Sequence, residues 1–107
     1  MQFEKIEELT LEHFKGGEGA LRTRMVVNEA NRFMRGCLKR GCSIGMHTHE
    51  DNCEILYVIS GEGVAVMDGA EEVLLAGDYH YCPKGHAHTL KNCKEEDLIF
   101  FAVIPNQ

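Results

Sequence analysis

Turn-forming residues recur at short intervals along this chain of 107 residues. They cluster at 28–31, 50–52, 61–63, 68–69, 77–78, 83–85 and 92–97. The runs between these clusters are short and rich in Val, Ile, Leu, Tyr and Phe, and no run after residue 15 has a convincing helical period. Short strands separated by turns in this way are typical of an all-β sandwich or a small barrel.

The apolar runs give the expected strands. They lie near 22–27, 33–40, 43–49, 54–60, 63–68, 71–75, 79–82, 87–91 and 97–104. Residues 1–15 are ambiguous, because Phe3 and Ile6 suit a helix whereas Leu9 and Leu11 alternate as in a strand. We expect a strand or a short helical turn packed across the barrel. The length suits one domain, which we assign to residues 1–107.

Two of the expected strands need cover on both faces. In 54–60 the even-numbered apolar residues point one way and the odd-numbered ones the other, and the stretch 98–104, LIFFAVI, is apolar throughout. The barrel interior covers one face. The other needs a second sheet or another subunit, so we expect a homodimer.

Charge and cysteine content exclude several classes of protein. The net charge is -6 and the basic residues are scattered apart from a loose group within 32–40, so we expect no nucleic-acid partner. The N-terminus lacks the apolar stretch of a signal peptide and no run is long enough to span a membrane, which favours a cytoplasmic protein. The cysteine count of 5, without C-x-x-C spacing, predicts free and mostly buried thiols.

A cluster of polar residues precedes the apolar run 54–60. His47 and His49 stand two residues apart, so on a strand their imidazoles project from the same face. The residues 50–52 are turn formers that would reverse the chain and bring Glu54 back beside the two imidazoles. An H-x-H pair alone is weak evidence for a metal site.

A second histidine cluster strengthens that evidence. His80, His86 and His88 surround the tight turn formed by Pro83 and Gly85. Imidazole and carboxylate ligands suit Fe, Mn, Ni, Cu or Zn, and three histidines with one glutamate leave positions free on an octahedral ion. The two clusters together predict one divalent transition metal of undetermined identity.

The spacing of these residues resembles that of the cupins. Their first motif, G-x5-H-x-H-x4-E-x6-G, matches Gly41, His47, His49, Glu54 and Gly61. Their second motif, G-x5-P-x-G-x2-H-x3-N, matches Gly77, Pro83, Gly85, His88 and Asn92. The resemblance to a small single-domain bacterial cupin implies an antiparallel jelly-roll barrel, with motifs at 41–61 and 77–92. It implies the metal ligands His47, His49, Glu54 and His88.

The chain departs from many cupins just before the Pro-x-Gly turn. There it carries polar side chains within the stretch 79–82, which would allow His80 or Cys82 to face the cavity as an acid, base or nucleophile. The alternative places both on the outer face or satisfied in the core, and strand parity across the turn does not decide between them. We assign Cys82 and His86 to the pocket rim, His80 a catalytic role, and Glu54 a role in proton transfer.

The resemblance leaves the reaction open, because the fold supports many functions. It implies a metal-dependent enzyme of the dioxygenase, isomerase or lyase type that acts on a small polar organic substrate bound through oxygen atoms. One alternative is a non-catalytic module that binds or senses a sugar or another small molecule. A further alternative is a structural homodimer with a vestigial metal site.

Overall fold

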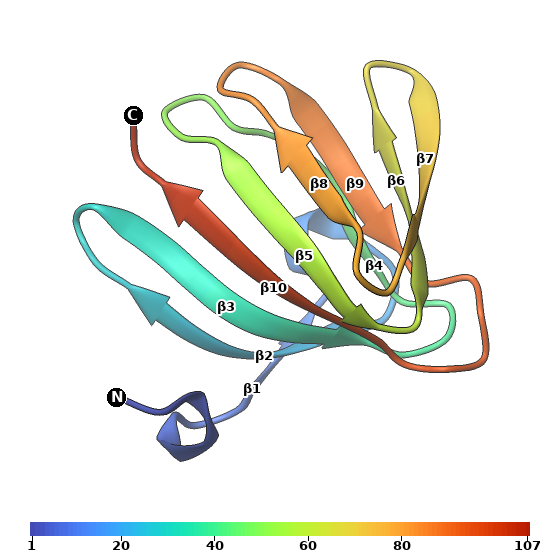
Figure 1. Cartoon of the computed structure of the whole chain (residues 1–107), viewed down its shortest axis with the longest axis horizontal. Coiled ribbons are helices and arrows are strands. Elements are labelled where there is room, and N and C mark those ends of the chain that lie inside the picture. The colour runs from blue at the N-terminus through green and yellow to red at the C-terminus, as the bar shows by residue number, and fades with distance from the viewer.

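The computed structural model describes residues 1–107, which form two antiparallel sheets that face each other (Figure 1). The strands are β1 (Leu9–Glu12), β2 (Ala20–Val27), β3 (Asn31–Leu38), β4 (Ser43–Thr48), β5 (Glu54–Ser60), β6 (Glu62–Met67), β7 (Ala70–Leu75), β8 (Tyr79–Cys82), β9 (Ala87–Lys91) and β10 (Leu98–Pro105). One sheet has the order β1-β2-β3-β10-β5-β8 and the other β4-β9-β6-β7. This arrangement is the predicted all-β jelly roll.

The expected strands are confirmed, with bounds that agree or differ by about two residues at most. The ambiguous N-terminal segment contains both predicted alternatives: 3-10 helices at Phe3–Lys5 (η1) and Phe14–Gly16 (η2), and the strand β1 between them. β1 does not cross the barrel, however. It pairs antiparallel with β2, from Leu9↔Thr23 to Glu12↔Ala20, and so forms the edge strand of the larger sheet.

Alternating side chains of the central strands form the core. On β10, Leu98, Phe100, Ala102 and Ile104 point inward and are buried, and on β5 Leu56 and Val58 do the same. Phe100 lies against Gly36 of β3, where an added Cβ would come within 2.4 Å of the phenyl ring. The predicted alternation on 54–60 and 98–104 is therefore confirmed, and it fills the space between the sheets.

The outer face of the larger sheet remains partly uncovered. Phe3 of η1 packs edge-on against Phe33 and Phe101, with ring centroids 5.8 and 5.7 Å apart. Beyond that contact the outward residues of β5 and β8 are exposed: Ile55 45%, Ile59 41%, Tyr79 72% and Tyr81 53%. The structure contains no helix with the length and hydropathy needed to cross a bilayer.

A close backbone contact joins η2 to the start of β4. A Cβ on Gly45 would lie 2.1 Å from the carbonyl oxygen of Lys15, and a Cβ on Gly17 would lie 2.1 Å from that of Ser43. Only glycine at both positions allows this approach. The contact holds Phe14 and Lys15 at the open end of the barrel, beside the residues described next.

Candidate metal centre

Four side chains from different elements meet inside the barrel: His47, His49, Glu54 and His88. His47 on β4 pairs directly with His88 on β9, so both imidazoles leave the same face of the smaller sheet. The turn after β4 reverses the chain and returns Glu54 at the first position of β5 in the other sheet. The predicted strand, turn and return strand are therefore present, and we call these four residues the ligand cluster.

The distances within the ligand cluster fit one octahedral ion. Nε2 of His49 lies 3.0 Å from Nε2 of His88, and each of these atoms is 3.1 Å from Oε1 of Glu54. Nε2 of His47 lies 4.0 Å from the same oxygen. With metal–ligand bonds of about 2.1 Å, adjacent octahedral ligands lie about 3.0 Å apart and opposite ones about 4.2 Å. The separations of 3.0 and 3.1 Å among His49, His88 and Glu54 fit three mutually adjacent positions. Nε2 of His47 is farther from Glu54 than these atoms are from one another, so a tetrahedron, which has equal separations, fits less well.

Hydrogen bonds on the far side of two imidazoles aim their Nε2 atoms at the centre. Nδ1–H of His47 donates to the carbonyl oxygen of Gly45 at 2.7 Å, and Nδ1–H of His49 donates to Oδ1 of Asn52 at 2.6 Å. Neutral imidazoles held in this way turn the lone pairs of Nε2 inward. A lone pair of His49 then lies close to Nε2 of His88 and to a carboxylate oxygen. A cation among these donors removes the repulsion.

Burial and hydrogen bonding shift the pKa values of the ligand cluster in different directions. Burial would raise the pKa of Glu54, but its interactions with the surrounding His47, His49 and His88, which stabilise the carboxylate, outweigh burial and hold that pKa well below the usual carboxyl value. Burial lowers the pKa of His49, yet its contacts with Glu54 and Asn52 raise it overall. For His88 burial dominates, and its pKa is lowered. Glu54 is therefore an anion, which is the form that binds a metal.

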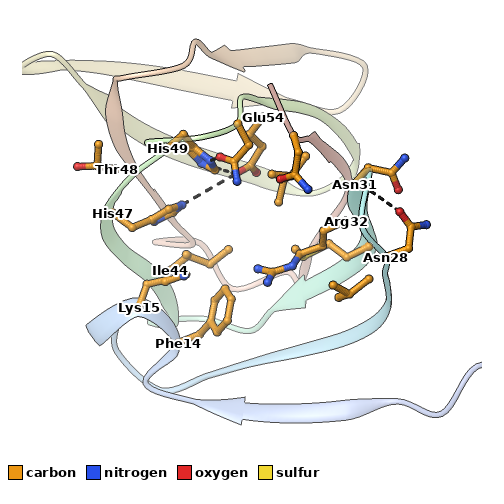
Figure 2. Close-up of a pocket in the computed structure, with 15 residues that line it drawn as sticks. Phe14, Lys15, Asn28, Asn31, Arg32, Ile44, His47, Thr48, His49 and Glu54 are labelled. Carbon is orange, nitrogen blue, oxygen red and sulfur yellow. Dashed lines mark hydrogen bonds and ion pairs between the residues drawn. The ribbon is translucent and has the colours of Figure 1, made fainter.

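A cavity of about 280 Å³ opens beside the ligand cluster. His47, His49 and Glu54 line one side, and Arg32 and Lys15 bring positive charge to it. Figure 2 shows the guanidinium of Arg32 directed into the cavity, toward the side where His47 lies. Its Nε atom is buried and has no hydrogen-bond partner in the protein. The site thus combines a group of metal donors with an unpaired cationic donor.

Three residues predicted near the cavity do not line it. His80 and Cys82 point inward from β8 and are buried, but they lie behind the ligand cluster. Nε2 of His80 is 2.9 Å from Nδ1 of His88, and burial raises the pKa of the Cys82 thiol to about 11. His86 is an exposed turn residue whose Nδ1 lies 2.9 Å from a carboxylate oxygen of Asp68. The predicted rim positions of Cys82 and His86 therefore differ from the structure.

Two residues that shape the site, Arg32 and Asn52, were not predicted from the sequence. Arg32 appeared only as one member of a loose basic group, although it stands two residues before Met34 and shares its inward face. Asn52 appeared only as a turn former, yet its side chain fixes the ring of His49. Alternate residues of strand 31–38 share a face, so Arg32 could have been placed on the inward face from its spacing to another inward residue. That step required one residue of the strand to be known to point inward.

The match to known proteins agrees with this geometry. The family model for the cupin domain matches residues 34–104. A *Thermotoga maritima* protein named oxalate-binding protein is 34% identical over 100 residues, which cover 88% of this chain and 83% of that protein. The crystal structure of a predicted oxalate decarboxylase from *Thermotoga maritima* matches with a TM-score of 0.93 and 30% identity, covering 99% of this chain and 97% of that one.

A cupin 2 conserved barrel domain protein from *Salinispora arenicola* is also similar, with a TM-score of 0.71 and 30% identity over 80% of this chain and 76% of that one. The family model covers more than half of the 107 residues and includes all four members of the ligand cluster. The chain therefore belongs to the cupin family.

Proposed function

We propose that this chain binds one divalent transition metal through His47, His49, Glu54 and His88, and that the metal and Arg32 together bind a small organic anion. The observation that carries the proposal is the arrangement of the four donors. His49, His88 and Glu54 would hold three mutually adjacent positions of an octahedral ion and His47 a fourth, which would leave two positions open. Those two positions are adjacent, so one ligand with two oxygen atoms can fill both.

Arg32 supports an anionic ligand. Its buried Nε lacks a protein partner, and a guanidinium matches a carboxylate in a two-point hydrogen bond. The similar protein from *Thermotoga maritima* is named for oxalate, which has two carboxylates. A compact dicarboxylate offers oxygen atoms to the metal and to the guanidinium at once, and the cavity of about 280 Å³ suits a ligand of that size.

Turnover of the bound anion is a second candidate function, favoured by the similarity to a predicted oxalate decarboxylase. The metal would supply Lewis acidity to the bound oxygens. Arg32 would orient the anion, and Phe14 and Ile44 would limit water at the cavity wall. Formate and carbon dioxide released from oxalate by the manganese-loaded protein would support decarboxylation. The predicted role of Glu54 in proton transfer stays a prediction, as does a catalytic role for His80.

Calorimetry on the metal-loaded protein tests the binding proposal. We expect elemental analysis to find close to one transition metal per chain, and oxalate to bind the manganese-loaded form more tightly than acetate. Arg32→Met should weaken oxalate binding by about 10-fold to 100-fold, since a hydrogen bond to a charged group contributes about 1.5 to 3 kcal/mol. Arg35→Met, on the exposed outer face of the same strand, is the matched control. Equal oxalate affinity in the two variants would refute the role of Arg32, and a protein that takes up no metal would refute the proposal as a whole.

The proposal includes a cytoplasmic homodimer. Ile55, Ile59, Tyr79 and Tyr81 form an exposed apolar surface on β5 and β8, which a second copy would bury. All five cysteines are free, as suits a reducing compartment. Sedimentation of the wild type should give the mass of a dimer and that of Ile55→Lys the mass of a monomer. A wild-type monomer at micromolar concentration would contradict the dimer.

A further inference from the structure

A hydrogen-bonded chain runs from His88 to the surface of the barrel, on the side away from the cavity. Nδ1 of His88 lies 2.9 Å from Nε2 of His80, and Nδ1 of His80 lies 3.0 Å from Oε1 of Glu72. His80 is buried, whereas the Glu72 side chain is 43% exposed. The planes of the two rings differ by only 15°. The chain thus connects a member of the ligand cluster to a surface carboxylate through one buried imidazole.

The chain also joins the two sheets. His80 belongs to β8, the edge strand of the larger sheet, and Glu72 belongs to β7, the edge strand of the smaller one. His88 therefore differs from His47 and His49, whose far-side partners Gly45 and Asn52 lie within three residues of them in the sequence. Its orientation depends on contacts across the barrel.

Metal binding fixes the direction of every hydrogen bond in the chain. A ring nitrogen that binds a metal carries no hydrogen, so when Nε2 of His88 binds, its Nδ1 carries the hydrogen and donates to Nε2 of His80. His80 must then carry its own hydrogen on Nδ1, where it donates to the Glu72 carboxylate. The opposite tautomer of His80 would set two N–H groups against each other. Glu72 is the acceptor that favours the required tautomer.

We propose that Glu72 and His80 are positioning residues, which orient His88 for the metal and increase the affinity of the site. This inference rests on the proposed metal binding. Partners of this kind, behind a metal-binding histidine, typically change metal affinity by about 10-fold to 100-fold. His80 thereby has a function other than the predicted catalytic one, since it contacts a ligand residue and not the cavity.

Zinc titration of three variants tests this role. Glu72→Ala removes the acceptor and should weaken Zn²⁺ binding by about 10-fold or more. Glu72→Gln keeps an acceptor oxygen and should lose less zinc affinity than Glu72→Ala. It also replaces Glu72→Ala in the test if that variant does not fold. Glu71→Ala is the matched control, because it removes the same charge from the neighbouring exposed position of the same strand. Thermal unfolding of the metal-free variants measures any purely structural contribution of the contact between the sheets.

Nitrogen-15 NMR of the zinc-loaded protein adds a readout that a structural role would not change. We expect His80 and His88 both to carry hydrogen on Nδ1 in the wild type, and His80 to shift toward the Nε2–H form in Glu72→Ala. Equal zinc affinity in Glu72→Ala and Glu71→Ala, or an Nε2–H form of His80 in the zinc-loaded wild type, would overturn the inference while leaving the metal site intact. A wild type that binds no zinc or other transition metal would instead refute the proposed function, and this inference with it.

Discussion

Replacing Gly45 by alanine should both destabilise the protein and loosen the metal site. The new Cβ would lie 2.1 Å from the carbonyl oxygen of Lys15 and 2.8 Å from backbone atoms of Gly16 and Gly17. An ordinary van der Waals contact needs about 3.4 Å, so the η2 backbone or β4 must move by about 1.3 Å. No flexible side chain can absorb this shift, because every close atom belongs to the backbone.

The expected cost is about 2 to 3 kcal/mol in the free energy of unfolding, the upper range for overpacking of a well-filled site. For a domain of this size, that corresponds to a fall in Tm of roughly 10 °C. Metal affinity should fall as well, for two reasons. Gly45 supplies the carbonyl that accepts from His47 at 2.7 Å, and η2 carries Phe14 and Lys15 into the cavity wall.

Urea unfolding of the metal-free protein measures the first effect, and manganese titration measures the second. Gly69→Ala is the control, because its Cβ would meet no atom within 4 Å while its φ of +76° still opposes a side chain. That variant should lose about 1 kcal/mol and keep its metal affinity. If Gly45→Ala is no less stable than Gly69→Ala and binds manganese as tightly as the wild type, the close approach of η2 and β4 does not hold the site together.

Two further predictions concern the ligand cluster. His49→Ala and His88→Ala should each weaken metal binding by at least about 100-fold, as elemental analysis after dialysis would show, while Met46→Ala on the exposed face of β4 should retain the metal. The stability of the metal-free protein should depend on pH through Glu54. Its native pKa lies well below the unfolded value of about 4.3, so its stabilisation is present above that pH and is lost as the pH falls below it. The raised pKa of His49 adds stability below about pH 6.5, whereas the lowered pKa of His88 removes stability in that range, so the two contributions have opposite signs. Urea unfolding at pH 7 and pH 3.5 should show a smaller acid loss in Glu54→Gln, and an unchanged loss would contradict the ionised native Glu54.

The fold was predictable because its signals are local. Turn residues separate the strands, and alternation within 54–60 and 98–104 marks which side chains enter the core. The ligand cluster was predictable because the two motifs resemble those of the cupins, and the resemblance rests on residue spacing within the sequence. Neither prediction required knowledge of which strands lie side by side.

The surroundings of the ligand cluster depend on pairings that the sequence order hides. β8 pairs with β5 although two strands lie between them in the chain, and the register sets Glu54 opposite Cys82 and Leu56 opposite His80. Residues directly opposite in an antiparallel pair share a face, so an inward Glu54 requires an inward Cys82 and an inward His80. The sequence could not show which side chains of 79–82 point inward, because the Pro-x-Gly turn breaks the alternation, but this pairing shows it directly.

The ligand residues also differ in whether the contacts that orient them lie close in the sequence or far apart in it. His47 and His49 are oriented by acceptors close to them in the sequence, so a short segment of chain contains the information that aims them. His88 is oriented by His80, and His80 by Glu72, which come from the edge strands of opposite sheets. If the fourth ligand is aimed only when these edges meet, metal binding and closure of the barrel are thermodynamically linked. Bound metal should then slow hydrogen exchange at the β7 and β8 edges more than at β1, which lies far from this chain of contacts.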